Sequence, residues 1–532
     1  MTADLVIQNA KVFTANPRQP FVSGISVSGS TIRHVGNDIA DHIGPNTEVI
    51  GADGGLVTPG FVDAHVHPAT SGLDRLRCSF EEASNREDAL RSVSEYARAN
   101  PDEDWILGAG WASDWFDRGC PSAEDLDSVV SDRPVFLMNA DGHDAWVNTA
   151  ALARANIDGT TSDPSDGRIE RLANGRPQGT LHEGAFILME RVTPEDTVED
   201  FEAGLRRGQQ ELMGYGVTAW QDAAVTDEVH AAYLNLASRG GLVGRVVGAM
   251  WWDRHRGLDQ IEELIARRER SAPGFRPTTV KLMLDGVAEN YTASVLDPWL
   301  EADGTPTSNL GMDFIDPDEL KMIVTALDSH GFQCHFHSLG DRAVRNALDA
   351  IQTSIATNGR NRNRHHLAHI QFVHPEDIPR FAALDAIANA QPLWACNDAA
   401  QLELTKPFIT SERFSWQYPF RSLLDSGARV GMGSDWAVST ANVMAEVDVA
   451  INRTCPNGDP LDPQQRLTPT EALTAFTSGS AYINGAEASY GMLRPGMQAD
   501  LVLFDRDPFV DGPFRDTEVA FTMIGGNIAY EA

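Results

Sequence analysis

The stretch TPGFVDAHVHPAT, residues 58–70, is an apolar run of strand-forming residues that ends in two histidines one residue apart. On an extended chain every second side chain points the same way, so we expect Asp63, His65 and His67 to project together from the end of a buried strand. Two imidazoles and a carboxylate directed into one space need a partner, and the rest of the sequence indicates what that partner is.

Eight strand-like runs alternate with amphipathic helical stretches along the middle of the chain. They cover residues 60–67, 216–223, 245–252, 279–286, 332–341, 366–373, 386–393 and 429–438. Alternation of strands and helices is typical of a parallel α/β architecture, and eight is the number of strands in a TIM (β/α)8 barrel. We therefore predict an α/β fold with a TIM barrel over residues 59–484.

The two ends of the chain differ from this middle part. Short strand-like runs separated by turns fill the first fifty or so residues and return only at the far end. Because neither end can bury a β face alone, we predict that residues 1–58 and 485–532 form one small composite β-sandwich domain. Residues from about 72 to 198 break the rhythm of one strand and one helix, which predicts an insertion after the first strand.

Composition narrows the class of protein. The 532 residues carry a formal charge of −34 without any lysine-rich block, which argues against nucleic acid and against anionic membrane surfaces as partners. No run approaches the roughly 18 apolar residues of a spanning helix and no secretion signal is visible, so we expect a cytoplasmic protein. The five cysteines are scattered and never form a CxxC pair, which favours free buried thiols over disulfides or a thiolate zinc site.

Polar residues occupy the carboxyl ends of several predicted barrel strands, where TIM-barrel enzymes keep their active sites. These residues are His65 and His67 in strand one, Lys281 in strand four, His335 and His337 in strand five, His369 in strand six and Asp435 in strand eight. Neutral imidazoles and carboxylates are the ligands that zinc and similar divalent ions prefer. The sequence therefore predicts a metal centre at the barrel mouth.

The motifs in this order resemble the metal-dependent amidohydrolase superfamily, in the branch called amidohydrolase family 3. The resemblance covers nearly the whole chain through GFVDAHVHP, DGHDAWVN, GRPQGTLHEGA, GVTAWQDA, VKLMLDGV, HSLGDRAV, YPFRSLLDSGARVGMGSDWAV and GMLRPGMQADLVLFD. It implies one or two divalent ions, with Zn²⁺ expected, and a homodimer. The metal ligands it implies are His65, His67, Lys281, His337, His369 and Asp435. The resemblance also implies that Lys281 can be carboxylated and then bridge two ions. It implies that Asp435 transfers protons in addition to binding metal.

Other histidines near these motifs have simpler explanations. His335 lies one layer deeper than His337 in the same strand, and we interpret it as a satisfied core residue. His365 and His366 precede the ordered part of strand six, and we interpret them in the same way.

Two of the candidates have structural alternatives. Lys281 has an alternative as the buried ion-pair partner of Asp285 or Asp222. Asp435 has an alternative as a helix cap in its Gly-Ser-Asp turn. For both residues we favour the metal-centre role.

The reaction implied is hydrolysis of a carbon–nitrogen bond that is not a peptide bond of a protein. The bond belongs to an amide, N-formyl or N-acyl group of a small molecule. A metal lowers the pKa of bound water towards about 7, and Asp435 would take the proton and pass it to the departing nitrogen. The alternatives are a deaminase or cyclic-amide hydrolase with a single zinc ion, and a catalytically silent barrel that serves as a scaffold.

Aromatic residues suggest how the substrate is held. The predicted insertion carries Trp111, Trp115 and His143, which are candidates for a lid or pocket wall and favour a substrate with an apolar or aromatic group. Trp115 and Trp146 are equally compatible with the core of the insertion. Further candidates that follow barrel strands are Trp251, Trp252 and Trp394.

Overall fold

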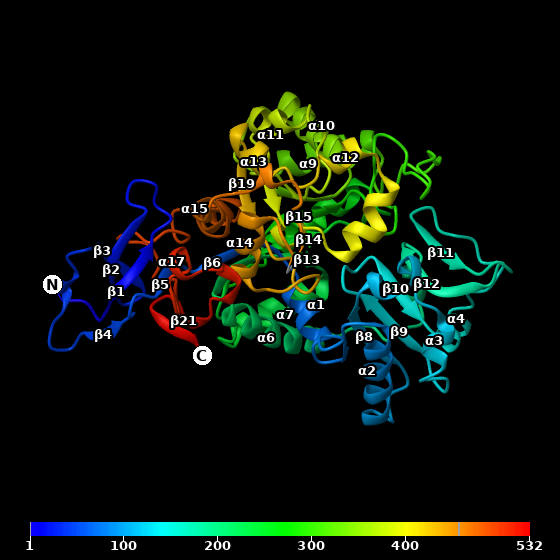
Figure 1. The fold of residues 1–532 in the computed structure, drawn as a ribbon, viewed down its shortest axis with the longest axis horizontal. Helices are drawn as coiled ribbons and strands as arrows, with labels where there is room; N and C mark the ends of the chain where they lie inside the picture. The colour runs from blue at the N-terminus through cyan, green and yellow to red at the C-terminus, as the bar shows by residue number, and fades with distance from the viewer. Residues whose placement is uncertain (1, 456–457) are drawn as a thin grey trace.

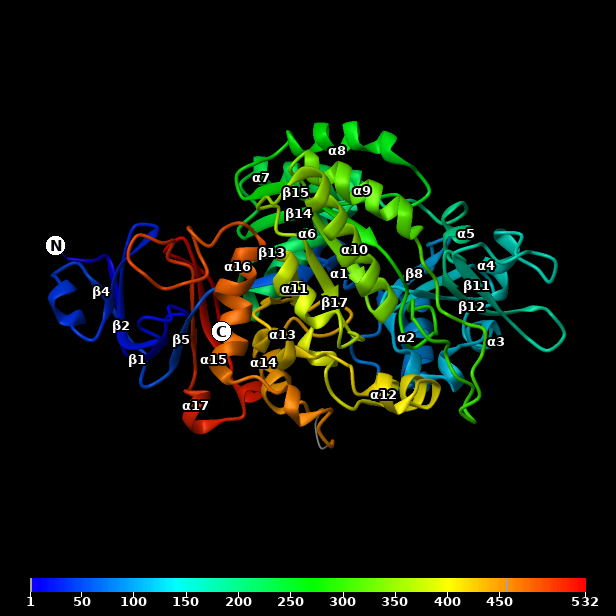
Figure 2. The same cartoon turned by 90° about the horizontal axis from the view of Figure 1, so that it is seen from above.

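The computed structural model describes residues 2–455 and 458–532. Three parts lie in a row, with the barrel in the middle, a sheet built from both chain ends on one side and a separate α/β part on the other (Figures 1 and 2). The expectation of a barrel with two additional parts is confirmed.

The central sheet contains eight strands, and every hydrogen-bonded pair of neighbours is parallel. The strands are β6 (Phe61–Val66), β13 (Val217–Val225), β14 (Arg245–Trp251), β15 (Phe275–Met283), β16 (Gln333–Ser338), β17 (His366–His369), β18 (Ile387–Ala390) and β19 (Arg429–Met432). Each overlaps one of the eight predicted runs, although β15 begins four residues earlier than predicted. The gap between β19 and β6 is closed by the segment after β19, where Asp435 N donates to His65 O at 2.8 Å and His67 N donates to Trp436 O at 3.1 Å.

Helices cover the outside of the barrel. The main ones are α1 (Pro68–Asp74), α6 (Val198–Gly214), α7 (Asp227–Ser238), α8 (Ile261–Arg268), α9 (Pro317–Ser329), α10 (Asp341–Asn358), α11 (Ile378–Leu384), α13 (Phe420–Asp425), α14 (Val443–Asn452), α15 (Pro469–Thr474) and α16 (Ser480–Ile483). Helices α1 and α6 approach closely through glycines, because a Cβ atom on Gly72 would lie 1.9 Å from Gly204 O. This contact fixes the helix that directly follows His67.

The terminal sheet joins the two ends of the chain. Its strands are β1 (Leu5–Phe13), β2 (Phe21–Ser28), β3 (Thr31–Gly36), β4 (Glu48–Gly51), β5 (Leu56–Pro59), β20 (Leu501–Phe504), β21 (Val519–Ile524) and β22 (Asn527–Glu531). Strand β20 pairs antiparallel with β5. Strand β1 pairs with β4 through residues 5–8 and with β5 through residues 11–12, so the strands form one continuous sheet around their core rather than two separately bonded sheets.

The segment between α1 and α6, residues 75–197, is the insertion, and it forms a six-stranded mixed sheet with its own core. It contains β7 (Cys78–Ser79), β8 (Ile106–Trp111), β9 (Val135–Asn139), β10 (Asp144–Val147), β11 (Gly167–Arg171) and β12 (Pro177–Glu183), with helices α2 (Arg86–Ala99), α3 (Ala123–Asp127), α4 (Thr149–Arg154) and α5 (Ile187–Glu190).

The cysteines depart from the expectation of free thiols. Cys396 and Cys455 form a disulfide, with their Cα atoms 5.4 Å apart, whereas Cys78, Cys120 and Cys334 are free. The two partners are 59 residues apart in sequence, and the folding of α14 beside the segment after β18 brings them together. Across the described residues, no helix combines the length and the apolar character needed to cross a membrane.

Candidate metal centre

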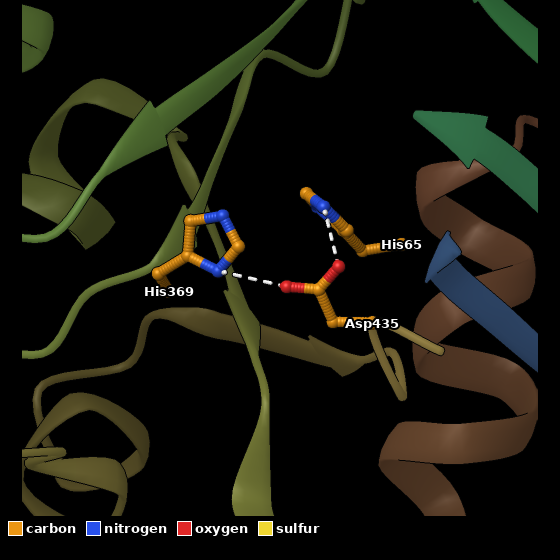
Figure 3. A group of neighbouring side chains, drawn as sticks. All are labelled: His65, His369 and Asp435. Carbon is orange, nitrogen blue, oxygen red and sulfur yellow. Dashed lines mark ion pairs between the residues drawn. The ribbon is translucent and has the colours of Figure 1, made fainter. Parts of the chain in front are cut away.

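Four polar side chains meet at the carboxyl ends of the barrel strands. His65 lies near the end of β6 and His67 directly follows this strand, His369 ends β17, and Asp435 lies shortly after β19. One oxygen of Asp435 lies 3.4 Å from His65 Nε2 and 3.1 Å from His67 Nε2, and the other lies 3.6 Å from His369 Nδ1. Figure 3 shows the carboxylate of Asp435 between the rings of His65 and His369.

These donors fit a divalent cation. Both ring nitrogens of His369 and Oδ1 of Asp435 are buried, and within the described chain they have no hydrogen-bond partner. Burial lowers the pKa of His369 to about 3, so the ring is neutral and its lone pair is free. Burial opposes ionisation of Asp435, but the ring of His67, 3.1 Å from Oδ1, contributes to a pKa below its usual value. The separations of 3.1–3.6 Å match the spacing of about 3.4 Å between ligands bound about 2.1 Å from one tetrahedral zinc ion.

Lys281 lies beside this group, on β15. Its Nζ is buried 3.5 Å from His65 Nε2, and burial lowers its pKa to about 7. The alternative of a buried ion pair is wrong, because no described carboxylate lies within 4.0 Å of Nζ. Asp285 instead accepts three backbone N–H groups, and Asp222 accepts the hydroxyl of Tyr233.

The two histidines of β16 have different surroundings. The ring of His337 lies 4.5 Å from that of His369, and its Nδ1 lies 3.5 Å from Asp285 Oδ1. His337 thus borders the metal centre on the side of His369. His335 lies deeper, and its Nε2 shares a hydrogen bond of 2.7 Å with His65 Nδ1, which leaves Nε2 of His65 facing Asp435.

His365 and His366 both have protein partners. Asp328 accepts from His365 Nε2 at 2.9 Å, and the other ring nitrogen of His365 accepts from the backbone of Cys334. Both nitrogens of His366 are bonded to side-chain amides, those of Gln221 and Asn389. Neither ring faces the metal centre with a free nitrogen.

Asp63 does not join the histidines, although it shares their alternation on β6. Its carboxylate accepts the backbone N–H of His65 and both the N–H and the hydroxyl of Ser434, at 2.6–3.1 Å. Burial raises the pKa of Asp63 to about 7. Gly433 permits this close approach, because a Cβ atom there would lie 2.4 Å from His65 N. Asp63 therefore ties β6 to the turn that carries Asp435.

The backbone at the site is held in unusual conformations. His369 and Asp435 have positive φ angles of 72° and 55°. His369 N donates to the side chain of Gln391, which directly follows β18, at 2.7 Å, and this bond holds the conformation. Such outliers persist where the surrounding structure over-determines them, and they cluster at functional sites.

The insertion reaches the barrel mouth through His143. The ring of His143 lies 5.0 Å from that of His337, and its Nδ1 lies 2.9 Å from Glu183. Burial alone would lower the pKa of His143, but the charge of Glu183 raises it to about 9. Glu183 in turn accepts the hydroxyl of Thr292, in the loop after β15, at 2.7 Å. His143 is therefore a buried cation beside the metal centre.

The two candidate tryptophans of the insertion pack in or against its own core. Trp111 is fully buried in the core of the insertion and donates its indole N–H to Leu137 O, so it leaves no surface for a substrate, and the expectation for it is wrong. Trp115 packs against the same core and is partly exposed. Trp394, after β18, stacks on His369 with ring centroids 5.3 Å apart.

Glu183 is a residue near the barrel mouth that was not predicted from the sequence. The motif GRPQGTLHEGA contains it, but its partners His143 and Thr292 lie 40 and 109 residues away. The only local signal is an acidic residue next to a histidine within an insertion motif.

The chain is similar in sequence and in fold to several known proteins. The sequence model described as Amidohydrolase family matches residues 48–530. Protein LONG AFTER FAR-RED 3 of Arabidopsis thaliana is 29% identical, over 100% of this chain and 92% of the relative. N-substituted formamide deformylase of Arthrobacter pascens is 26% identical, over 99% and 98%. The solved structure of an uncharacterized metal-dependent hydrolase from Pyrococcus horikoshii has the same fold, with a TM-score of 0.73 at 24% identity over 95% and 98% of the two chains.

Proposed function

This chain belongs to the amidohydrolase family and is a hydrolase of carbon–nitrogen bonds; from this premise we propose that it uses a divalent metal to hydrolyse an amide, N-formyl or N-acyl group of a small molecule. The observation that carries the proposal is the position of Asp435, whose two oxygens face three histidines at the barrel mouth. The similarity to a formamide deformylase supports the N-formyl group among these choices.

The side chains that would hold the ion are His65, His67, His369 and Asp435, with Lys281 and His337 at the border of a second position. When bound, an ion such as Zn²⁺ makes water more acidic and polarises a carbonyl oxygen. His335 acts through His65, because its hydrogen bond to Nδ1 fixes the ring orientation.

Asp435 has the properties of a proton carrier. Its low pKa keeps it ionised at neutral pH, so it can accept a proton from the attacking water. The protonated carboxyl is then a donor for the departing nitrogen, and one group serves both steps. Its carboxylate is buried, which strengthens its interaction with reacting groups.

The walls of the site support a substrate with an apolar or aromatic part. Trp394 presents a half-buried indole beside His369. His143, held as a cation by Glu183, is positioned to donate a hydrogen bond to a substrate oxygen near His337.

The experiment is to compare wild type with Asp435→Asn on a panel of N-formyl amines, N-acyl amino acids and aryl amides, with released amine as the readout. At matched metal content, we expect Asp435→Asn to lower kcat about 100- to 10,000-fold. The exposed Asp117→Asn variant is the control for loss of one carboxylate. Normal turnover of Asp435→Asn would contradict the proton role, and activity unaffected by removal of all metal would contradict the metal.

Metal content also distinguishes a centre with two ions from the alternative with a single zinc ion. A deaminase or cyclic-amide hydrolase with one ion predicts one equivalent at the barrel mouth and release of ammonia or a ring-opened product. Two metal equivalents at the barrel mouth of wild type, both of them lost when Lys281 is substituted, favour a centre in which Lys281 bridges two ions.

A further inference from the structure

A second group of potential ligands lies in the insertion, outside the barrel. It consists of Cys120, in the loop after the short 3₁₀ turn Asp117–Gly119, Glu170 on β11 and His182 on β12. One donor atom of each residue lies within 4.8 Å of the other two. Three segments that are far apart along the insertion therefore present sulfur, oxygen and nitrogen to one point.

The two distances from His182 to the other members of this group are close to those of ligands around an ion. His182 Nε2 lies 3.5 Å from Glu170 Oε2 and 3.8 Å from Cys120 Sγ. The nitrogen–oxygen distance is long for a hydrogen bond, in contrast to the 2.6 Å on the other side of the same ring. Zinc bond lengths of about 2.0–2.3 Å place tetrahedral ligands about 3.4 Å apart for nitrogen and oxygen and about 3.6 Å for nitrogen and sulfur.

The neighbouring residues hold the ligands in place. Asp144, on β10, accepts a hydrogen bond from His182 Nδ1 and another from Asn290 of the barrel at 3.1 Å. A carboxylate on the far nitrogen of a histidine is the usual support of a metal ligand, because it directs the lone pair of the other nitrogen at the ion. The loop of Cys120 is fixed as well, since its carbonyl accepts from Gln178, also on β12, at 2.9 Å.

We propose that Cys120, Glu170 and His182 form a second metal site, which binds a thiophilic divalent cation of the Zn²⁺ type with its fourth position open to solvent. A sulfur ligand distinguishes this site from the barrel mouth, whose facing donors are nitrogen and oxygen. Cys120 and Glu170 are partly exposed, so an ion has access. The thiol loses its proton on binding, and the thiolate becomes the ligand. The bound ion would pin the loop of Cys120 to β11 and β12.

The test uses the full chain freed of metal and reloaded with Co²⁺ or Zn²⁺. Cobalt bound to a thiolate gives a sulfur-to-metal charge-transfer band in the near ultraviolet, which nitrogen and oxygen ligands do not give. We expect this band in wild type and its loss in Cys120→Ser, together with one metal equivalent, while the remaining equivalents stay bound. Zinc should also slow proteolysis of the insertion in wild type but not in Cys120→Ser.

A second pair of variants guards against misfolding. Glu170→Gln should weaken binding at this site at least tenfold, and the exposed Glu124→Gln, which removes the same charge, should not. Absence of the charge-transfer band in folded wild type, or equal metal content in wild type and Cys120→Ser, overturns the site and leaves His182 as a hydrogen-bonded bridge between Asp144 and Glu170. Because the barrel-mouth metal is counted separately in Cys120→Ser, failure here does not touch the proposed function.

Discussion

Among the four lysines of the chain, Lys281 is the one whose chemistry is changed most by its position. The other three lysines, Lys11, Lys321 and Lys406, are at least partly exposed, whereas Lys281 is buried among histidines. A pKa of about 7 leaves a large fraction of its amine neutral at neutral pH. Only the neutral amine adds carbon dioxide, and the resulting carbamate is an anion that can bridge two cations. The lysine is thus prepared for the modification implied by the sequence resemblance.

We expect metal uptake to depend on bicarbonate through Lys281. Metal-free protein reloaded in buffer purged of carbon dioxide should bind fewer metal equivalents than protein reloaded with bicarbonate. In Lys281→Met the two conditions should give the same, lower value, whereas Lys321→Met should behave as wild type. Metal analysis after gel filtration measures the difference. Equal uptake by wild type with and without bicarbonate would show that Lys281 remains an unmodified amine.

At the scale of elements, the decisive feature is how β6 is joined to the turn after β19. These two segments are not paired as strands, and Asp63 and Ser434 connect them across 371 residues of sequence. The same turn holds Asp435 through its bond to the carbonyl of His65. Closure of the barrel and placement of Asp435 therefore depend on the same few hydrogen bonds.

Ser434→Ala tests this link. The substitution removes the hydroxyl donor of a buried carboxylate, which should lower the free energy of unfolding by about 2 kcal/mol. It should also lower kcat, because Asp435 follows directly in the turn. Unfolding followed by circular dichroism and a kinetic assay measure both effects. The exposed Ser415→Ala serves as the matched control, and a variant that loses neither stability nor turnover would show that the turn is held by other contacts.

At the scale of elements, most of the barrel and part of the candidate site could be predicted from the sequence. All eight barrel strands were predictable because parallel buried strands are short apolar runs between helices. The ends of these strands indicated His65, His369 and Asp435, since parallel strands present their carboxyl ends at one rim. Alternation gives the direction of a side chain but not its depth, so it could not show that Asp63 turns to Ser434. Composition likewise could not distinguish Trp111 in a core from a pocket wall.

At the scale of the whole molecule, the two outer parts attach to different ends of the barrel. Arg245, the first residue of β14, forms a double hydrogen bond with Asp500 beside the terminal sheet. The insertion contacts the opposite end, where Asn290 and Thr292 bond to its carboxylates. The terminal sheet and the insertion thus lie on opposite sides of the barrel (Figure 1). The insertion borders the candidate metal centre, and the terminal sheet lies away from it.

The disulfide makes the stability of the whole chain dependent on redox conditions. Cys396 follows Trp394, which stacks on His369, and Cys455 follows α14, so the bond fastens the segment that borders the metal centre. Closing a loop of 59 residues stabilises a folded chain by about 4 kcal/mol in the chain-entropy description. In a reducing compartment this contribution would be absent.

We therefore expect denatured, unreduced protein to titrate three thiols, and five after reduction. Reductant should lower the melting temperature of wild type by several degrees and leave Cys455→Ser, which already lacks the bond, unchanged. Because the bond fastens the segment that carries Trp394, the reduced protein should also lose affinity for apolar substrates before it loses metal. Five reactive thiols in unreduced protein would show that the two sulfurs remain separate, and the segment after β18 would then depend on packing alone.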